Sequence, residues 1–317
     1  MNNSPNDQLK KNDDEIDLLE LLHVLLQGKW IIVSVTAFAS IIGVIYSLYL
    51  PNIYKSEAIL ARADSSNDMS KALGGMGGIA SLAGLNLSSE SGKSNSTKAI
   101  EKLNSLSFFE NHILPYIFLP NLMALDSWDI HTNDLIYNEN LYNSDTNTWV
   151  RKYSYPKTQI PTAQESFKVF KQKHFGLKED SKNGFLTLTI KHQSPFIAKQ
   201  WADLIINQVN AFYREKDKSE SEKSVIYLNK QINVTSLSEL KEAIAELLQN
   251  ETKKLTLIEV KQSYVFEYID PPAIMELKSE PKRALICILA ALFGGMLSIL
   301  FAFLKYYYFK KKILIRS

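Results

Sequence analysis

The residues of this chain that could bind a metal or act in catalysis are its histidines, its acidic residues and a single cysteine. Their spacing does not match known metal-binding or catalytic motifs. The five histidines are dispersed, with no His-Glu-x-x-His pair among them: His23, His112, His131, His174 and His192. Metal ligands usually recur at short, fixed spacings, so we expect no metal site and no cofactor. The acidic pairs Asp13-Asp14 and Glu179-Asp180 are typical of helix starts and turns, and no Gly-x-Ser-x-Gly motif occurs. We therefore predict no catalytic residue and no enzymatic activity.

A glycine-rich stretch suggests phosphate binding as a second candidate chemistry. Residues 74–78 (GGMGG) lie in a segment rich in Ser and Asn, residues 64–98. A phosphate-binding loop needs a glycine five positions before its Gly-Lys-Ser, whereas Leu87 precedes Gly92-Lys93-Ser94 at that spacing. We expect instead a flexible loop that seats its apolar part on a neighbouring subunit. The residues predicted at that contact are Leu82, Ala83 and Gly84.

Two long apolar segments divide the chain. Trp30–Leu50 and Ala284–Leu304 each contain 21 residues without a charged side chain. At about 1.5 Å per residue, each helix would span roughly 30 Å of hydrocarbon. The sequence therefore predicts a two-pass membrane protein, with transmembrane helices at 30–50 and 284–304.

Basic residues next to these segments predict the orientation. Eight lie outside the pair, at Lys10, Lys11, Lys29, Lys305, Lys310, Lys311, Lys312 and Arg316. Five lie on the inner side of the pair, at Lys55, Arg62, Lys278, Lys282 and Arg283. By the positive-inside rule we place both termini in the cytoplasm. Residues 1–29 would then be a cytoplasmic segment ending in an interfacial helix, residues 305–317 a basic tail, and residues 51–283 an exported domain.

The overall composition limits the partners of that domain. Apolar residues make up 45% of the chain and charged residues 22%, which excludes a disordered protein. The formal net charge is only +2, so a nucleic-acid partner is not indicated. The only cysteine, Cys287, lies within the second apolar segment, so the exported domain has no disulfide.

Small residues recur every four positions in both apolar segments. They are Ala39, Gly43 and Ser47 in the first and Ala290, Gly294, Ser298 and Ala302 in the second, with Gly295 next to Gly294. Such spacing lets helix backbones approach closely in a membrane. The partner stays open between the other helix of the same chain, a sister subunit and another membrane protein.

The exported domain is predicted to combine an α/β base with a long helical hairpin. We assign the base to residues 51–193 and 262–283 and the hairpin to residues 194–261. Strands are predicted at 54–61 and 263–270, and a β-hairpin over 175–190 turns at Asn183-Gly184. Helices are predicted at 97–111 and 163–174, whereas residues 126–157 read as irregular surface.

Local signals define the arms of the hairpin and its exit. Ser194-Pro195 is typical of a helix start, and Ser236 with Glu239 predicts a capping box where the second arm begins. A stiff connector then leads to the second apolar segment. Its residues are Pro271, Pro272, Pro281, Lys282 and Arg283. The fold class is therefore α+β, with two transmembrane helices flanking the domain.

In its order of elements the chain resembles the chain-length determinant (Wzz-type) polysaccharide co-polymerases of Gram-negative inner membranes. The matching pieces are Glu15-Ile16-Asp17-Leu18, Lys29-Trp30, Tyr54 to Leu60, Leu82-Ala83-Gly84, Tyr227-Leu228 to Leu248, Tyr264 to Pro272, and Pro281-Lys282-Arg283 leading to Gly294-Gly295. Departures are Glu280 before Pro281, where the family often has Ser, and residues 126–157, which match nothing in the family. The 13 residues after the second apolar segment are too few for a kinase, which favours the class without a cytoplasmic kinase domain.

The resemblance implies an oligomeric, non-enzymatic regulator of the length of O-antigen or a related lipopolysaccharide glycan. The implied partners are further copies in a ring, a membrane-embedded polymerase that contacts the second span at Gly294 and Gly295, the lipid bilayer, and the lipid-linked glycan as a further candidate. The exported domain would lie in the periplasm. An alternative is a periplasmic adaptor of an inner-membrane export machine, although the lipoyl-like strand pairs of adaptors are not evident. A two-pass sensor is disfavoured because no output domain follows.

Overall fold

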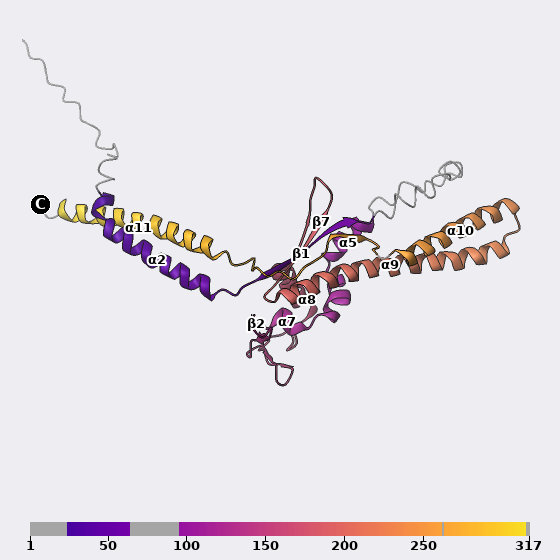
Figure 1. Ribbon diagram of the computed structural model, residues 1–317, viewed down its shortest axis with the longest axis horizontal. Helices are drawn as coiled ribbons and strands as arrows, with labels where there is room; N and C mark the ends of the chain where they lie inside the picture. The colour runs from indigo at the N-terminus through magenta and orange to yellow at the C-terminus, as the bar shows by residue number, and fades with distance from the viewer. Residues whose placement is uncertain (1–23, 64–94, 262, 315–317) are drawn as a thin grey trace, which may run out of the picture. The chain divides into compact units, whose positions relative to one another are not determined.

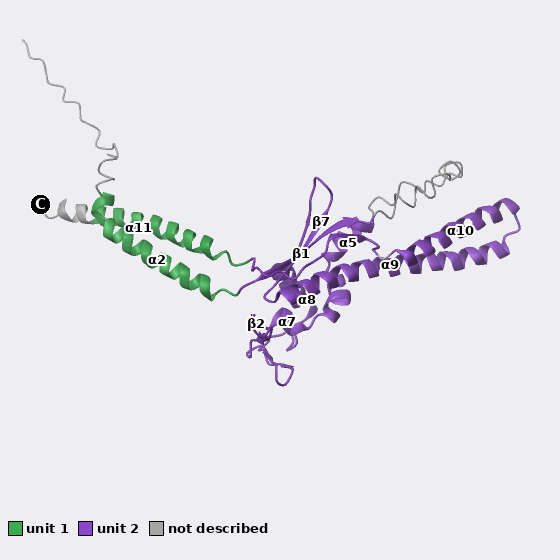
Figure 2. Cartoon of the chain, in the orientation of Figure 1, with its two compact units in different colours: residues 1–51, 280–317 green, residues 52–279 purple. Residues whose placement is uncertain are grey.

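The computed structural model describes residues 24–63, 95–261 and 263–314. Two compact units make up the chain, one formed by residues 1–51 and 280–317 and the other by residues 52–279 (Figure 2). The first contains the two helices with membrane-spanning composition, and the second combines helices with β-sheet. The α+β class predicted from the sequence is confirmed.

Two long apolar helices, α2 (Lys29–Tyr49) and α11 (Arg283–Leu314), form the first unit and lie side by side (Figure 1). By length and composition both could cross a membrane. Their outer faces expose large apolar side chains, among them Phe38, Ile45 and Met296. Such faces suit lipid, because lipid tails are themselves apolar. Helix α11 continues beyond the predicted Leu304 into the basic tail, since no Gly or Pro follows to end it.

A four-stranded antiparallel sheet forms the centre of the second unit. Its strands lie in the order β6 (Phe175–Glu179), β7 (Leu186–His192), β1 (Tyr54–Arg62) and β8 (Phe266–Asp270). The predicted β-hairpin between β6 and β7 is confirmed. Gly184 adopts a φ of 71°, and the Asn183 side chain accepts the N–H of Phe185 at 2.9 Å. Only glycine takes that backbone conformation without steric cost, which is why this pair turns the chain.

The inner face of the sheet packs against the beginning of α9 (Pro195–Val234). Alternate residues of β7 are buried, and α9 covers them with Trp201, Ile205 and Val209. Ser194 is the N-cap residue and Pro195 the first helical residue, as predicted. The Ser194 side chain makes no capping bond; its backbone N–H instead donates to Nδ1 of His192 at 3.0 Å.

Short helices complete this core. They are α5 (Asn95–Leu103), α6 (Leu106–Phe108), η1 (Phe109–Ile113), η2 (Leu114–Tyr116), α7 (Leu119–Met123), α8 (Ala163–Val169) and η3 (Phe170–His174). The prediction of one helix over 97–111 was wrong, because α5 ends at Leu103. Ser105 restarts the chain as the N-cap of α6, its hydroxyl accepting the N–H of Phe108 at 3.3 Å. Serine side chains compete in this way with continuous helix.

Helix α9 runs on beyond the sheet and pairs with α10 (Ser238–Val260) as a helical hairpin (Figure 1). With 40 residues, α9 is about 60 Å long at 1.5 Å per residue. The predicted capping box at Ser236 was wrong. The N-cap of α10 is Leu237, with no side-chain cap, because the helix begins at Ser238, one residue later than the motif requires.

Residues 118–160 form a small lobe that was not foreseen. Two antiparallel strand pairs replace the predicted irregular surface: β2 (Leu125–Trp128) with β3 (Leu135–Tyr137), and β4 (Tyr142–Asn143) with β5 (Thr148–Trp149). Phe118, Tyr137 and Trp149 pack their rings around the buried Tyr142, and the contacting ring centroids are 5.3 to 6.3 Å apart. Asn133 and Asn147 take positive φ at the turns. Strands of two to four residues carry too short a pattern to detect in sequence.

Candidate functional site

The small residues predicted for close helix packing face one another within the first unit. A Cβ atom added to Gly43 would overlap the Cβ of Ala290, and one added to Gly294 would overlap the Cβ of Ala39. Gly43 and Gly294 are buried. Of the three partners left open by the sequence, the structure therefore shows the other helix of the same chain.

The two buried serines of this interface satisfy their hydroxyls locally. Ser47 donates to the carbonyl of Val44 at 3.0 Å, and Ser298 donates to the carbonyl of Gly295 at 2.7 Å. Both hydroxyls are thus paired inside an apolar layer, where an unpaired polar group would be costly. Ser47 Oγ also lies 4.0 Å from Sγ of Cys287 on the facing helix.

Gly295 differs from its neighbour. Its added Cβ would meet only Oγ1 of Thr36, at 3.9 Å, so a side chain has room there. Gly28, which the sequence reading did not select, does contact α11: its added Cβ would lie 3.1 Å from the Cβ of Ala302. Gly28 does not fall on the four-residue spacing, which passes through Gln27, but it lies about three helical turns before Ala39 and so on the same face.

The predicted connector runs back beside the start of β1. The Ser56 hydroxyl donates to the carbonyl of Ala273 at 2.9 Å, and the N–H of Ser279 donates to the carbonyl of Ile53 at 2.9 Å. Pro272 is buried and Pro271 exposed within this segment. Pro281 and Lys282 precede α11, and Arg283 is its first residue. The predicted inter-subunit contact at Leu82, Ala83 and Gly84 lies outside the described residues.

Polar side chains tie the base of the α9–α10 hairpin to the sheet. Asn210 on α9 accepts the N–H groups of Val265 and Phe266 at 2.8 and 2.9 Å and donates to the Phe266 carbonyl at 2.9 Å. The carboxylate of Asp217 accepts from the Tyr264 hydroxyl at 2.5 Å and from Asn95 at 2.9 Å. Burial, together with this carboxylate, raises the pKa of Tyr264. The hairpin is therefore fixed at its root.

Farther along the hairpin, apolar side chains are exposed. They are Ile226, Tyr227, Val234, Leu237, Leu240 and Leu247. Several large apolar side chains exposed on one helical hairpin favour a contact with another molecule. Only part of each arm's apolar surface can face the other arm, because two helices bury one narrow seam.

His174 and the buried His192 form a pair at the edge of the core. The rings of His174 and His192 lie 5.6 Å apart, and Trp201 packs its edge against both. Nδ1 of His174 is 2.7 Å from the Lys191 carbonyl, and Nε2 of His192 is 3.1 Å from the Asn121 carbonyl. Within the described ranges, no group of three or more His, Cys, Asp or Glu side chains could hold a metal ion.

This pair predicts a loss of stability in mild acid. Burial lowers the pKa of both imidazoles to about 4, with Lys173 adding to the effect at His174 and His174 adding to it at His192. Because the ordinary pKa is 6.5, the unfolded chain binds more protons between these values. The free energy of unfolding therefore keeps the full contribution of the two neutral imidazoles above pH 6.5. It loses that contribution as the pH falls towards 4.

Thermal unfolding of the full chain in lipid nanodiscs at several pH values measures this effect. We expect the midpoint to fall from pH 7 to pH 4.5 and the fall to become smaller when His174 and His192 are both replaced by Gln. His131 is exposed, so His131→Gln serves as the control and should keep the full dependence. An equal fall in the double variant would contradict this assignment.

Comparison with known proteins adds the family. Residues 14–113 match the family model of the chain length determinant protein, Wzz. Over these residues the chain is similar to the Wzz family. The matched residues include α2 of the first unit and β1 and α5 of the second unit. The family resemblance noted in the sequence is confirmed.

Two solved structures are also similar. A "full-length bacterial polysaccharide co-polymerase" is 14% identical, with 93% of this chain and 99% of that chain covered at a TM-score of 0.39. A "Fragment of WzzB, Polysaccharide Co-polymerase from Salmonella Typhimurium" is 13% identical, with 72% of this chain and 100% of that chain covered at a TM-score of 0.31. Comparison with curated proteins found no match.

Proposed function

We propose that this protein regulates the chain length of a polysaccharide, O-antigen or a related lipopolysaccharide glycan, as a non-enzymatic partner of a membrane-embedded polymerase. The Wzz match over residues 14–113 is the observation that carries the proposal. It fits a chain whose described part consists of two membrane-capable helices and a tethered α+β unit. The regulator would act by contact, so it needs surfaces and not a reaction centre.

The proposal includes assembly into a ring of identical copies. The exposed apolar residues along the α9–α10 hairpin support it, because this surface has no partner of its own within the described part of the chain. The loop at Leu82, Ala83 and Gly84 is proposed as a further contact between copies. The lipid-linked glycan is a candidate ligand of the same assembly.

We further propose a two-pass topology in a Gram-negative inner membrane, with both termini in the cytoplasm and residues 52–279 in the periplasm. The excess of basic residues at the outer ends of the pair supports this orientation. The polymerase contact is proposed on α11 at Gly295, since Gly294 is covered by α2 within the chain. Reporter fusions that place residues 52–279 in the cytosol would overturn the topology.

Deletion of the gene tests the function. We expect the ladder of lipopolysaccharide bands to lose its preferred length and become a smooth distribution, with polymer still made. The intact gene on a plasmid should restore the preferred length. An unchanged ladder, or the disappearance of all polymer, would contradict the proposed role.

A further inference from the structure

The lobe formed by residues 118–160 ends in an exposed loop with an unusual composition. Residues 150–160 (VRKYSYPKTQI), called the 150–160 loop below, carry four exposed apolar or aromatic side chains: Val150, Tyr153, Tyr155 and Ile160. Tyr155 is 97% exposed. The resemblance to the co-polymerase family covers none of this segment, and the proposed function does not use it.

The charge of this region has a single sign. Between Asp145 and Glu165 the sequence contains Arg151, Lys152 and Lys157 and no acidic residue. Arg151 is paired internally, whereas Lys152 is exposed and Lys157 is mostly exposed. Tyrosines flanked by lysines are the side chains that membrane proteins place at the headgroup level of a bilayer. Lysines near such a surface are attracted by anionic lipids.

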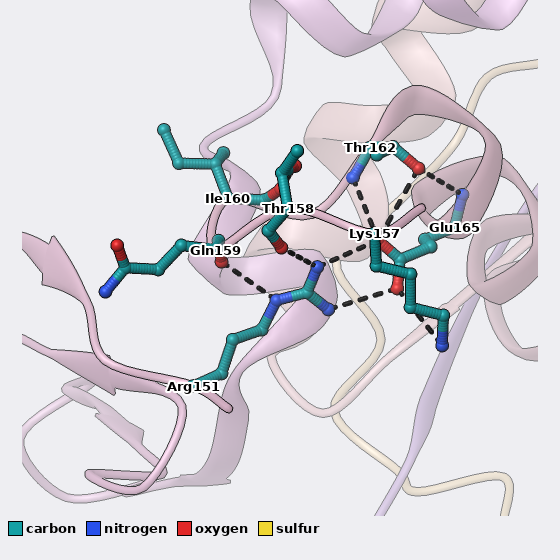
Figure 3. Close-up of polar contacts among 7 residues, drawn as sticks. All are labelled: Arg151, Lys157, Thr158, Gln159, Ile160, Thr162 and Glu165. Carbon is teal, nitrogen blue, oxygen red and sulfur yellow. Dashed lines mark hydrogen bonds and ion pairs between the residues drawn. The ribbon is translucent and has the colours of Figure 1, made fainter. Parts of the chain in front are cut away.

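The loop is held rigidly by a network around Arg151 (Figure 3). The guanidinium donates to both oxygens of Glu165, at 3.1 and 2.8 Å, and to the carbonyls of Thr158 and Gln159, at 2.6 and 2.8 Å. Glu165 in turn closes a capping box with Thr162 at the start of α8. The Arg151 hydrogen bonds hold the pKa of Glu165 down at about 2, so the pair stays ionised in mild acid.

Further hydrogen bonds pair several backbone carbonyls in and next to the loop. The Trp149 carbonyl accepts from the Gln159 side chain at 2.7 Å, the Ile160 carbonyl from the Thr158 hydroxyl at 2.6 Å, and the Ser154 carbonyl from the N–H of Lys157 at 3.0 Å. A loop that leaves water for a lipid interface must pair its backbone groups internally, because lipid offers no replacement for water. Part of this requirement is met within the protein, because the carbonyls of Ser154, Thr158, Gln159 and Ile160 already have donors.

The position of the lobe also favours the bilayer. Trp128 packs against Tyr54, the first residue of β1, with ring centroids 5.4 Å apart. His192, the residue paired with Tyr54 in the sheet, contacts the Asn121 carbonyl in the same lobe. The lobe therefore lies at the end of the sheet where the chain enters it. Only residues 50–53 separate Tyr54 from α2. This short connection keeps a bilayer that contains α2 close to that end of the sheet, which raises the effective concentration of lipid there.

We propose that the 150–160 loop docks on the surface of an anionic phospholipid bilayer, with Tyr153, Tyr155, Val150 and Ile160 entering the headgroup region and Lys152 and Lys157 contacting lipid phosphates. The loop thereby gives the unit formed by residues 52–279 a third attachment to the membrane, besides its two covalent connections. This attachment limits the orientations that the unit can adopt.

A fluorescent label between the two tyrosines tests the docking. The full chain carries Cys287→Ser, so that a cysteine introduced by Ser154→Cys is the only one and takes an environment-sensitive dye. The labelled protein is reconstituted into phosphatidylglycerol-containing liposomes whose headgroups carry nitroxide. An Ile226→Cys site on the α9–α10 hairpin is the matched control, because it is also exposed. We expect several-fold stronger nitroxide quenching at residue 154 than at residue 226.

Two changes then separate the chemical contributions. Tyr153→Ser with Tyr155→Ser should bring the quenching at residue 154 close to that of the control. Lys152→Gln should weaken it in phosphatidylglycerol liposomes and change it little in phosphatidylcholine alone. Equal quenching at residues 154 and 226 would overturn the proposal. So would self-quenching between labelled copies at residue 154 without nitroxide quenching, which would mean that a second copy covers the loop.

Discussion

The Gly294→Leu variant is expected to separate α2 from α11, whereas Gly295→Leu is expected to leave them paired. A leucine at residue 294 would have to enter the space that the Ala39 side chain occupies. Overpacking of this kind typically costs about 1–3 kcal/mol. A leucine at residue 295 points where the nearest atom is 3.9 Å from an added Cβ, so the helices need not move. The two glycines are adjacent, which makes them closely matched controls for each other.

Cross-linking inside the membrane measures the separation. Ser47 Oγ and Cys287 Sγ lie 4.0 Å apart, so Ser47→Cys beside the native Cys287 places two sulfurs within reach of a disulfide. We expect efficient oxidation by copper phenanthroline in this background and with Gly295→Leu, and a much lower yield with Gly294→Leu. Equal yields in both glycine variants would show that the helices do not pack through Gly294.

The same variants separate packing from partner contact. If the polymerase contacts α11 at Gly295, Gly295→Leu should alter the glycan length distribution while the cross-link still forms. Gly294→Leu should alter both. A Gly295→Leu variant with a normal glycan ladder at normal expression would remove the proposed contact and leave the helix pairing in place.

The Trp201→Ala variant is expected to lose about 3–5 kcal/mol of stability, the usual cost of removing a buried large aromatic side chain. Trp201 is 2% exposed and joins α9 to the sheet through contacts with His174, His192 and Phe170. Its removal leaves a cavity where the hairpin is rooted, and the rigid sheet can fill little of it.

Urea unfolding of the full chain in nanodiscs, followed by circular dichroism, measures this loss. Tyr116 is mostly exposed, so Tyr116→Ala is the control and should change stability by no more than about 0.5 kcal/mol. Trp201→Phe should recover part of the loss, because a smaller ring refills some of the cavity. A Trp201→Ala midpoint equal to that of Tyr116→Ala would contradict the packing described for this core.

Features with a strong local cause could be predicted from the sequence. The two apolar segments have the length and composition of spans, Gly184 alone suits its turn, and Ser194-Pro195 suits only a helix start. The small-residue stripes were visible for a similar reason, since their spacing follows the helical repeat. The small-residue stripes could not identify the helix that packs against them. Close packing needs small side chains whether the partner helix belongs to the same chain, another copy or another protein.

The parts that escaped prediction depend on tertiary contacts. The break after Leu103 follows from the capping bond of Ser105, which competes with the hydrogen bonds of a continuous helix. Local helix propensity does not decide between these two arrangements. The lobe at 118–160 is built from contacts among Phe118, Tyr142 and Trp149 and from the Arg151–Glu165 pair, which is separated by many residues in sequence. No periodic pattern encodes such contacts.

Varying the amount of this protein against a constant amount of polymerase tests length control most directly. A strain with the gene under a titratable promoter is grown at several induction levels, and both the lipopolysaccharide length distribution and the total polymer are measured. The account predicts that the preferred length sharpens or shifts with the level of this protein while total polymer stays nearly constant. Total polymer that rises in proportion to the protein, with an unchanged length distribution, would contradict it.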